Sequence, residues 1–263
     1  MNKLIYIIGL ALFIIVIIII SYFITNIINN TNESFGNDDK NENKNDNKNI
    51  YMTAEETIIF IRNDPDNYVK NLSKYDLVAR NMKNSQDYIN NIVNQCYNFS
   101  ERDMIKIDKC STIAKNYFNN GYKWKFALIG DIYEEGMPHT RNDIIFLSPK
   151  IVNYGEDELT KILIHESVHI YQRYNNMNKY LEENRYTISR RRDSELLIRA
   201  NPDLDEYIYK DRNGNELFYK YTSSMPTGIN DIIPTINEHP YEIMAYKIAE
   251  DYGRFKLSKY INI

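Results

Sequence analysis

The sequence predicts an α+β fold with a small β-sheet, and three observations support this prediction. Two short β-prone segments occupy residues 123–130 and 143–148. A helix that is apolar on more than one face follows them and begins after Gly155. A second helical pattern begins at Pro240 and carries apolar residues at helical spacing. Strands and helices are therefore both expected in the C-terminal half of the chain.

Residues 1–28 are predicted to be a transmembrane signal anchor. Residues 4–20 carry no charge, and the apolar character continues to about Ile28. About twenty such residues span the hydrocarbon core of a bilayer as a helix. The run is longer than the apolar region of a cleaved signal peptide and has no small-residue cleavage site. Lys3 before the run and acidic residues after it favour a cytoplasmic N-terminus, with the remaining chain extracytoplasmic or lumenal.

The rest of the chain is predicted to comprise a tether, a helical lead-in and a core domain. Residues 29–49 are nearly all Asn, Asp, Glu and Lys, a composition that buries too little apolar surface to fold. The lead-in, residues 50–121, opens with a capping-box pattern at Thr53 and Glu56. Longer helical patterns follow in the lead-in, at residues 72–97 and 102–118. Residues 122–263 would then form the core domain.

The two β-prone segments of the core have different expected positions in a sheet. Residues 143–148 are apolar, are ended by Pro149, and are predicted to form an edge strand. Residues 123–130 are predicted to form its neighbour. A peptide substrate could add itself as a further strand along such an edge. His139, on the polar segment before the edge strand, is expected to be an exposed loop residue rather than a functional one.

The helix after Gly155 contains the pattern H-E-x-x-H, formed by His165, Glu166 and His169. Two imidazoles four residues apart lie on the same face of a helix and suit two corners of a tetrahedral zinc site. Glu166 is rotated off that face and could reach a metal-bound water as a general base. The alternative is a buried helix with two hydrogen-bonded histidines and a surface glutamate.

A third metal ligand is expected from the helix that begins at Pro240. Glu242 projects from its first turn, and the small Ala245 one turn later would let the two helices approach closely. The alternative for Glu242 is an ordinary first-turn glutamate that interacts with the helix dipole. His239 and Glu238 are the next candidates for the ligand.

An H-E-x-x-H helix followed by a distant E-x-x-A helix resembles the gluzincin branch of the zincin metallopeptidases. The resemblance covers roughly residues 122–256 and implies a zincin-like core that acts on peptide or protein substrates. It implies one zinc ion and three ligands, namely His165, His169 and Glu242. It also implies that Glu166 is the catalytic base. Tyr246 stands where thermolysin-like enzymes carry an aspartate, so the chain departs from that group.

Residues near the third ligand are candidates for stabilising the oxyanion of the reaction. His239 and Tyr241 are close to Glu242 in sequence, and Tyr246 is a weaker candidate. The expected function is therefore that of a membrane-anchored zinc metallopeptidase. Two alternatives stay open: a zincin-fold binding or structural membrane protein without catalytic activity, and an accidental motif with no metal. The net charge of −4 is too small to argue for nucleic acid as a partner.

Between the two ligand helices, a charged helix is expected at residues 178–200. A hairpin should follow, because the Asn213–Gly214 pair favours a tight turn between β-prone segments. These segments are residues 206–210 and 216–221. The two cysteines, Cys96 and Cys110, could form a disulfide if the domain is lumenal and would be free thiols if it faces the cytosol.

Overall fold

The computed structural model describes residues 48–192, 197–233 and 238–261, and side chains as far as Arg254. The predicted signal anchor, and the predicted tether up to residue 47, lie outside the described residues. No helix in the described ranges is long and apolar enough to cross a membrane. Residues Lys48–Ile263 form one compact unit, which includes both the lead-in and the core. Its mixed α+β architecture agrees with the predicted fold class.

The main sheet has five strands. Four of them lie in the order β1-β3-β5-β4, and β2 pairs with β3 outside this path. The strands β1, β3 and β5 are parallel, whereas β4 is antiparallel to β5 and β2 is antiparallel to β3. Their bounds are β1 Ile50–Tyr51, β2 Cys96–Tyr97, β3 Lys125–Ile129, β4 His139–Arg141 and β5 Ile144–Leu147. The lead-in thus contributes two strands as well as helices.

Both β-prone segments form the predicted strands, but the edge strand is not the predicted one. The segment predicted at 143–148 is β5, which lies between β3 and β4. Its residues are buried, as continuous apolar runs are in parallel sheets. The strand β4 lies at the end of the order instead. Its sequence, His-Thr-Arg, has no apolar alternation from which a strand could be predicted.

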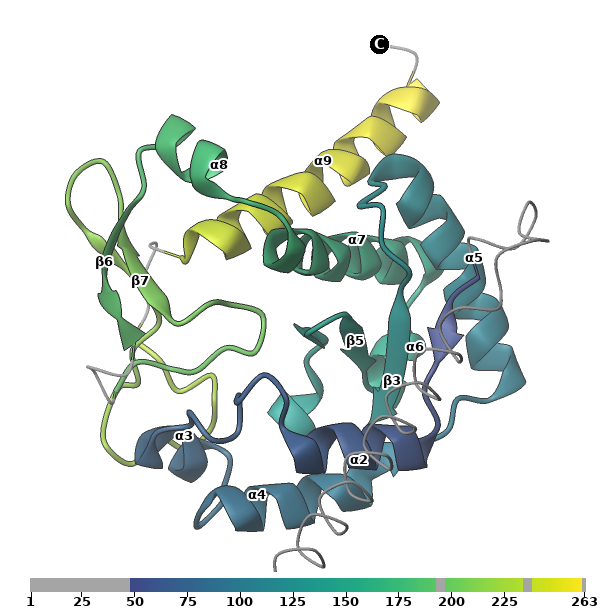
Figure 1. The fold of residues 1–263 in the computed structure, drawn as a ribbon. Helices are drawn as coiled ribbons and strands as arrows, with labels where there is room; N and C mark the ends of the chain where they lie inside the picture. The colour runs from purple at the N-terminus through teal and green to yellow at the C-terminus, as the bar shows by residue number, and fades with distance from the viewer. Residues whose placement is uncertain (1–47, 193–196, 234–237, 262–263) are drawn as a thin grey trace, which may run out of the picture. The chain divides into compact units, whose positions relative to one another are not determined.

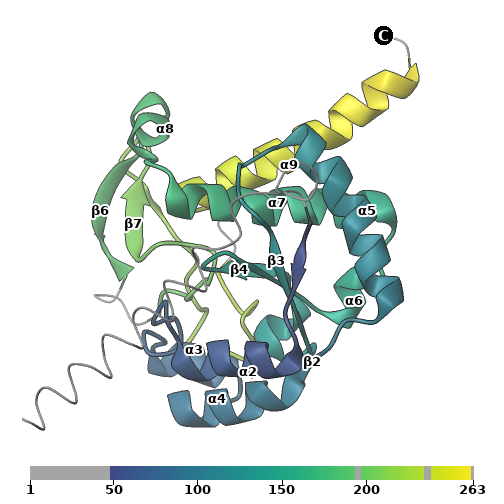
Figure 2. The same cartoon turned by 45° about the vertical axis from the view of Figure 1, so that its right-hand side comes forward.

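Helices cover both faces of the main sheet (Figures 1 and 2). Successive residues of a strand point to opposite faces. Accordingly, Phe126 packs with α5 (Glu101–Tyr117), α7 (Glu156–Tyr174) and α9 (Pro240–Ile261). Ala127 packs on the other side with α2 (Ala54–Asn63), α3 (Lys74–Ala79) and α4 (Ser85–Ile92). The short α6 (Pro149–Val152) follows β5 directly.

The lead-in helices begin at side chains that cap them. The capping box predicted at Thr53 and Glu56 is present at the start of α2, and Ser100 caps α5 in the same way. The single helix predicted at 72–97 is wrong, because this segment contains α3, α4, a 3₁₀ turn and β2. Asn81 adopts a left-handed φ of 56° after α3, and Asn84 then caps α4.

The two helices predicted to carry the metal ligands, α7 and α9, begin where they were predicted. Gly253 would suit the end of a helix, but α9 continues past it to Ile261. A Cβ added at Gly253 would lie 3.1 Å from Cε of Lys161, so the glycine allows a close approach to the Lys161 side chain of α7. Ala245 is completely buried, as expected for a small residue where the helices pack.

A second, three-stranded antiparallel sheet lies between the two ligand helices in the sequence. Its bounds are β6 Thr187–Arg191, β7 Tyr207–Lys210 and β8 Glu216–Leu217. The predicted hairpin is confirmed, with Gly214 at a left-handed φ of 83°. The helix predicted at 178–200 is wrong: α8 (Asn178–Glu183) is short, and β6 follows it. Charged residues of β6 pair across strands, for example Arg190 with Glu216 at 2.9 Å, rather than along a helix.

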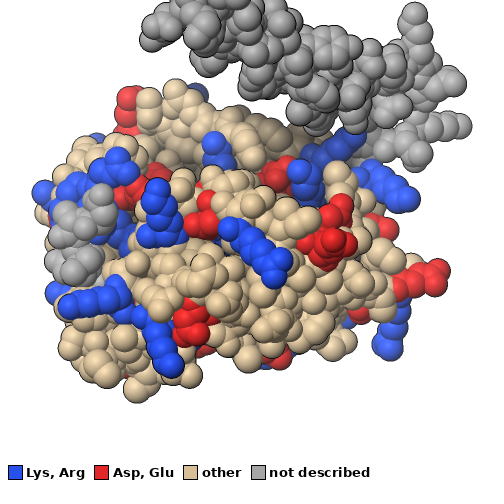
Figure 3. Space-filling model, turned by 60° about the horizontal axis from the view of Figure 1, so that its bottom comes forward, with Lys and Arg blue, Asp and Glu red and all other residues tan. Residues whose placement is uncertain are grey.

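Charged residues of both signs are interspersed over the face shown in Figure 3, which is the underside of the view in Figure 1. Cys96 and Cys110 are both free thiols, so the disulfide considered for a lumenal domain is absent from the structure. Cys96 lies in β2 and Cys110 is buried in α5.

Candidate metal centre

The helix α7 carries the H-E-x-x-H pattern through the interior of the domain. Gly155 stands at its N-terminus, and acidic residues occupy its first turn, where they complement the helix dipole. Apolar residues along α7 are completely buried, namely Leu159, Leu163, Ile164, Val168 and Ile170. His169 is completely buried and the side chain of His165 is 15 % exposed, so any polar atom they present needs a partner.

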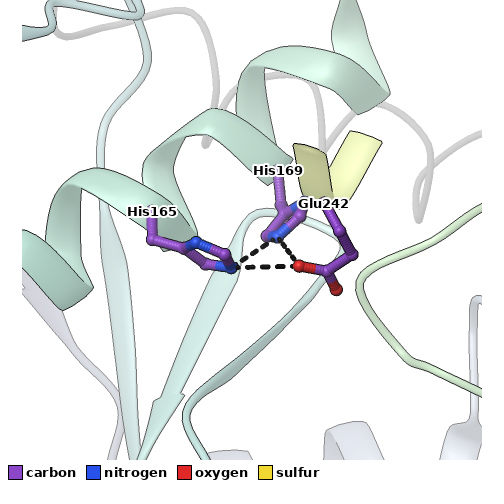
Figure 4. A group of neighbouring side chains, drawn as sticks. All are labelled: His165, His169 and Glu242. Atoms are coloured by element: carbon purple, nitrogen blue, oxygen red, sulfur yellow. Dashed lines mark hydrogen bonds and ion pairs between the residues drawn. The ribbon is translucent and has the colours of Figure 1, made fainter. Parts of the chain in front are cut away.

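His165, His169 and Glu242 converge on one point, as the sequence predicts (Figure 4). The two Nε2 atoms lie 3.1 Å apart. Oε2 of Glu242 lies 3.3 Å from Nε2 of His165 and 3.7 Å from Nε2 of His169. Ligand atoms bound tetrahedrally to zinc at its usual bond lengths are separated by about 3.3–3.5 Å. The three donors therefore match one face of a zinc tetrahedron.

Hydrogen bonds outside the triad orient two of its members. Gln172 Nε2 donates to the carbonyl of Tyr241 at 2.9 Å, which turns its Oε1 toward Nδ1 of His169 at 2.8 Å. Nδ1 of His169 must then donate, and its Nε2 is a lone pair directed at the triad. Asn201 Nδ2 donates to the other oxygen of Glu242 at 2.6 Å. Such outer partners fix ligand orientation in metal sites.

The electrostatics of the triad favour a cation bound between its members. Burial lowers the pKa of His169 to about 3, so this ring is neutral at pH 7. Burial also disfavours charge on His165, but its hydrogen bond to the carboxylate of Glu242 and the other nearby carboxylates outweigh burial and raise the pKa of His165. Burial likewise opposes the charge of Glu242, and the two histidines outweigh it and lower the pKa of this carboxyl. A carboxylate and an imidazole lone pair that face each other are stabilised by a proton or a metal ion between them.

Glu166 lies in the same cavity as the triad. This cavity has a volume of about 400 Å³, and its lining includes His165, Glu166 and Glu242. Glu166 is 2 % exposed, so the alternative of a surface glutamate is wrong. The hydroxyl of Thr140 donates to its Oε2 at 2.9 Å. Burial raises the pKa of the Glu166 carboxyl to about 7.

His239 and Tyr241 lie away from this cavity, contrary to the role considered for them. Both rings pack on Tyr209 of β7, with centroid distances of 4.9 and 5.9 Å. His239 Nε2 lies 3.5 Å from Asp205. Tyr241 is rotated by about 100° from Glu242 around α9, and His239 precedes this helix, which begins at Pro240.

Tyr246, one turn after Glu242, is the tyrosine that lines the cavity. Its ring centroid lies 4.5 Å from that of His165. Glu238, considered as an alternative ligand, instead accepts a hydrogen bond from the hydroxyl of Tyr219 at 2.6 Å. Neither Gln172 nor Asn201 was predicted as a partner of the triad. The position of Gln172, one turn from His169 on the same helix face, is a local signal that could have indicated it.

The middle main-chain position of the edge strand β4 is already occupied by side chains of the protein. Thr140, its middle residue, donates its N–H to Asp203 at 2.5 Å and accepts at its carbonyl from Arg173 at 2.8 Å. Pro138 has no N–H to offer, and Asn142 leaves the extended conformation with φ 52°. The expected addition of a substrate strand at this edge is therefore blocked by the protein's own side chains.

The segment that closes this edge is anchored in the core. Ala200 donates its N–H to Asp76 at 2.8 Å, and its carbonyl accepts from Arg80 at 3.3 Å. Arg173 also donates to the carbonyl of Pro202. His139, at the start of β4, is 2 % exposed and lines the cavity, so the expectation of an exposed loop histidine is wrong.

The candidate centre thus consists of two histidines and a glutamate from two helices, with a buried glutamate beside them in one cavity. Comparison of the chain with protein-family models, with curated proteins and with solved structures yields no match.

Proposed function

We propose that the protein is a zinc-dependent metallopeptidase in which His165, His169 and Glu242 hold one zinc ion and Glu166 is the general base. The observation that carries this proposal is the convergence of three donor atoms, two of them from buried residues, at separations of 3.1–3.7 Å. Two imidazoles and one carboxylate are a donor set that suits zinc, whereas calcium and magnesium favour oxygen ligands alone.

The number of ligands favours a catalytic rather than a structural site. Structural zinc sites are closed by four protein ligands, and catalytic sites have three and an open position. The triad has three members and stands on the wall of a cavity of about 400 Å³, which supplies room on its open side. Tyr246 and Glu166 line the same cavity, so polar groups are available beside that position.

A bound zinc ion would supply an activated water and polarise the carbonyl that is attacked. Glu166 would take the proton of the attacking water at its carboxylate and later give it to the leaving nitrogen. The hydroxyl of Thr140 would hold this carboxylate in place through its bond of 2.9 Å. The choice of a peptide bond rests on the resemblance to gluzincins, because the same residues could serve other hydrolyses.

The location of this activity is proposed from sequence alone. Residues 1–28 would anchor the protein in a membrane, and the uncharged run at 4–20 supports this. The catalytic unit would then be extracytoplasmic or lumenal, as the charges that flank the run favour.

Two measurements on the purified full chain test the proposal. Metal analysis should give one zinc per chain, and Glu242→Ala should lose it. Glu166→Gln should retain zinc but lose cleavage of a peptide library. Glu156→Gln is the matched control, because Glu156 lies in the first turn of the same helix and pairs with Lys109 at 2.7 Å outside the cavity. Zinc retention without any cleavage by the unaltered chain would favour an inactive binding protein, and absence of zinc would refute the proposed centre.

A further inference from the structure

Because the main-chain groups of Thr140 are already bonded, groups inside the cavity are the next candidates for holding a substrate. The lining of the cavity also includes Glu134, His139, Arg199 and Ile229. A buried polar atom without a partner in this lining would point to a ligand, because such a group is costly unless a ligand or water satisfies it.

His139 presents such an atom. Its ring is fixed, since it stacks on Phe146 with a centroid distance of 5.0 Å and an angle of 2°, and Tyr133 packs against it at 4.8 Å. Nδ1 lies 3.0 Å from the carbonyl oxygen of Met137, which can only accept, so Nδ1 carries the hydrogen. Nε2 is therefore a lone-pair acceptor. It is buried and has no hydrogen-bond partner among the described residues.

The charges in this lining restrict what His139 can bind. The carboxylate of Glu134 is already paired with Arg80 at 2.6 Å, so it is not free to attract a cation. Arg199 also lines the cavity and repels one. A carboxylate would lack the hydrogen that Nε2 of His139 requires. Burial lowers the pKa of His139 to about 4, so the ring is neutral at pH 7.

We propose that His139 is a specificity-determining residue, whose Nε2 accepts a hydrogen bond from a neutral amide or hydroxyl side chain of the substrate. This inference rests on the proposed peptidase function and names the chemistry of one of its subsites. Sites that hydrogen-bond a substrate N–H or O–H discriminate strongly against analogues without it, because a buried polar group of the site is then left unpaired.

Matched peptides test this on the zinc-loaded full chain. Each pair of peptides differs in one residue near the scissile bond, on either side of it. Met replaces Gln in one kind of pair and Val replaces Thr in the other, so that the side chain keeps its size but loses its hydrogen-bond donor. At one of the positions tested, the peptide with Gln or Thr should have a kcat/KM about 10- to 100-fold higher than its partner with Met or Val. In His139→Phe, which keeps an aromatic ring against Phe146, the ratio should fall to about one. A ratio near one in the unaltered chain, or an unchanged ratio in the variant, overturns the proposal.

A binding measurement separates failure of this proposal from failure of the peptidase proposal. Full chain with ¹⁵N-labelled histidine is titrated with propionamide and with butanone, which has the same shape but no N–H. The Nε2 resonance of His139 should move with propionamide and stay in place with butanone. Equal shifts, or no shift, overturn the inference even if peptides are cleaved. A selective shift without cleavage supports the acceptor site and counts against the peptidase. This experiment needs no variant, so it decides the matter even if His139→Phe fails to fold.

Discussion

Replacing Gln172 should weaken zinc binding although Gln172 contributes no ligand atom. Its Oε1 accepts from Nδ1 of His169 at 2.8 Å, and its Nε2 donates to the carbonyl of Tyr241 at 2.9 Å. Gln172→Ala leaves a buried imidazole N–H without an acceptor and frees the ring to rotate. An unsatisfied buried donor costs about 1–3 kcal/mol. Because about 1.4 kcal/mol is a factor of ten in an equilibrium constant, the Kd for zinc should rise by about 10- to 100-fold, the range seen for outer partners of metal ligands.

The assay is competition for zinc against a chelator of known affinity. The unsatisfied N–H of His169 also destabilises the folded protein without metal, and this takes up part of the cost of about 1–3 kcal/mol. The Tm of each metal-free variant is therefore measured in parallel. Gln172→Glu keeps an acceptor for His169 and should lose less zinc affinity than Gln172→Ala. Gln86→Ala is the control, because Gln86 is exposed on α4 and bonds only to Asn90 at 3.0 Å. A Gln172→Ala protein with the zinc Kd of the unaltered chain would refute the assigned orientation of His169.

Further predictions concern the same region. Asn201→Ala removes the donor 2.6 Å from Glu242 and should raise the zinc Kd by about tenfold in the same competition assay. The pKa of His139 is lowered to about 4 in the folded state. The contribution of this neutral ring to the free energy of unfolding should therefore be fully present above about pH 6.5 and decrease as the pH falls from 6.5 toward 4. The loss of up to about 3 kcal/mol is measurable by urea unfolding at several pH values, and His139→Phe should remove this contribution. Arg80→Met leaves the buried charge of Glu134 without its partner and should destabilise the fold by about 3–5 kcal/mol in the same unfolding assay. Chelation of zinc should lower the Tm of the unaltered chain but not that of Glu242→Ala, because a ligand that binds only the folded state stabilises it.

The elements that carry the triad could be predicted because their signals are local. The spacing of His165 and His169 places both rings on one helix face whatever surrounds the helix. Pro240 fixes the start of α9, and this start places Glu242 in the first turn. The packing of α7 against α9 depends on tertiary contacts, which a local pattern does not show. The small Ala245, which is completely buried, was the local feature that indicated a close approach of the two helices.

The environment of the triad could not be predicted, because it depends on contacts between distant parts of the chain. His139 lies in a polar segment and was therefore expected on the surface. It is buried because Arg141, two residues later, is completely buried and paired with Asp64 at 2.6 Å and Asp66 at 2.5 Å. These partners are more than 70 residues away in sequence, and no local pattern in the segment indicates them. Asn201 likewise reaches Glu242 across 41 residues.

The strand β4 links the proposed chemistry to the lead-in. Its Thr140 holds Glu166 through the side chain and closes the sheet edge through the main chain, while His139 faces the cavity. Asp64 and Asp66 neutralise the buried Arg141 of this three-residue polar strand. Both aspartates belong to the segment between α2 and α3. The geometry of the candidate site therefore depends on residues 50–121 as well as on residues 122–263. A protein that lacks the residues before 122 should lose the cavity along with the sheet edge.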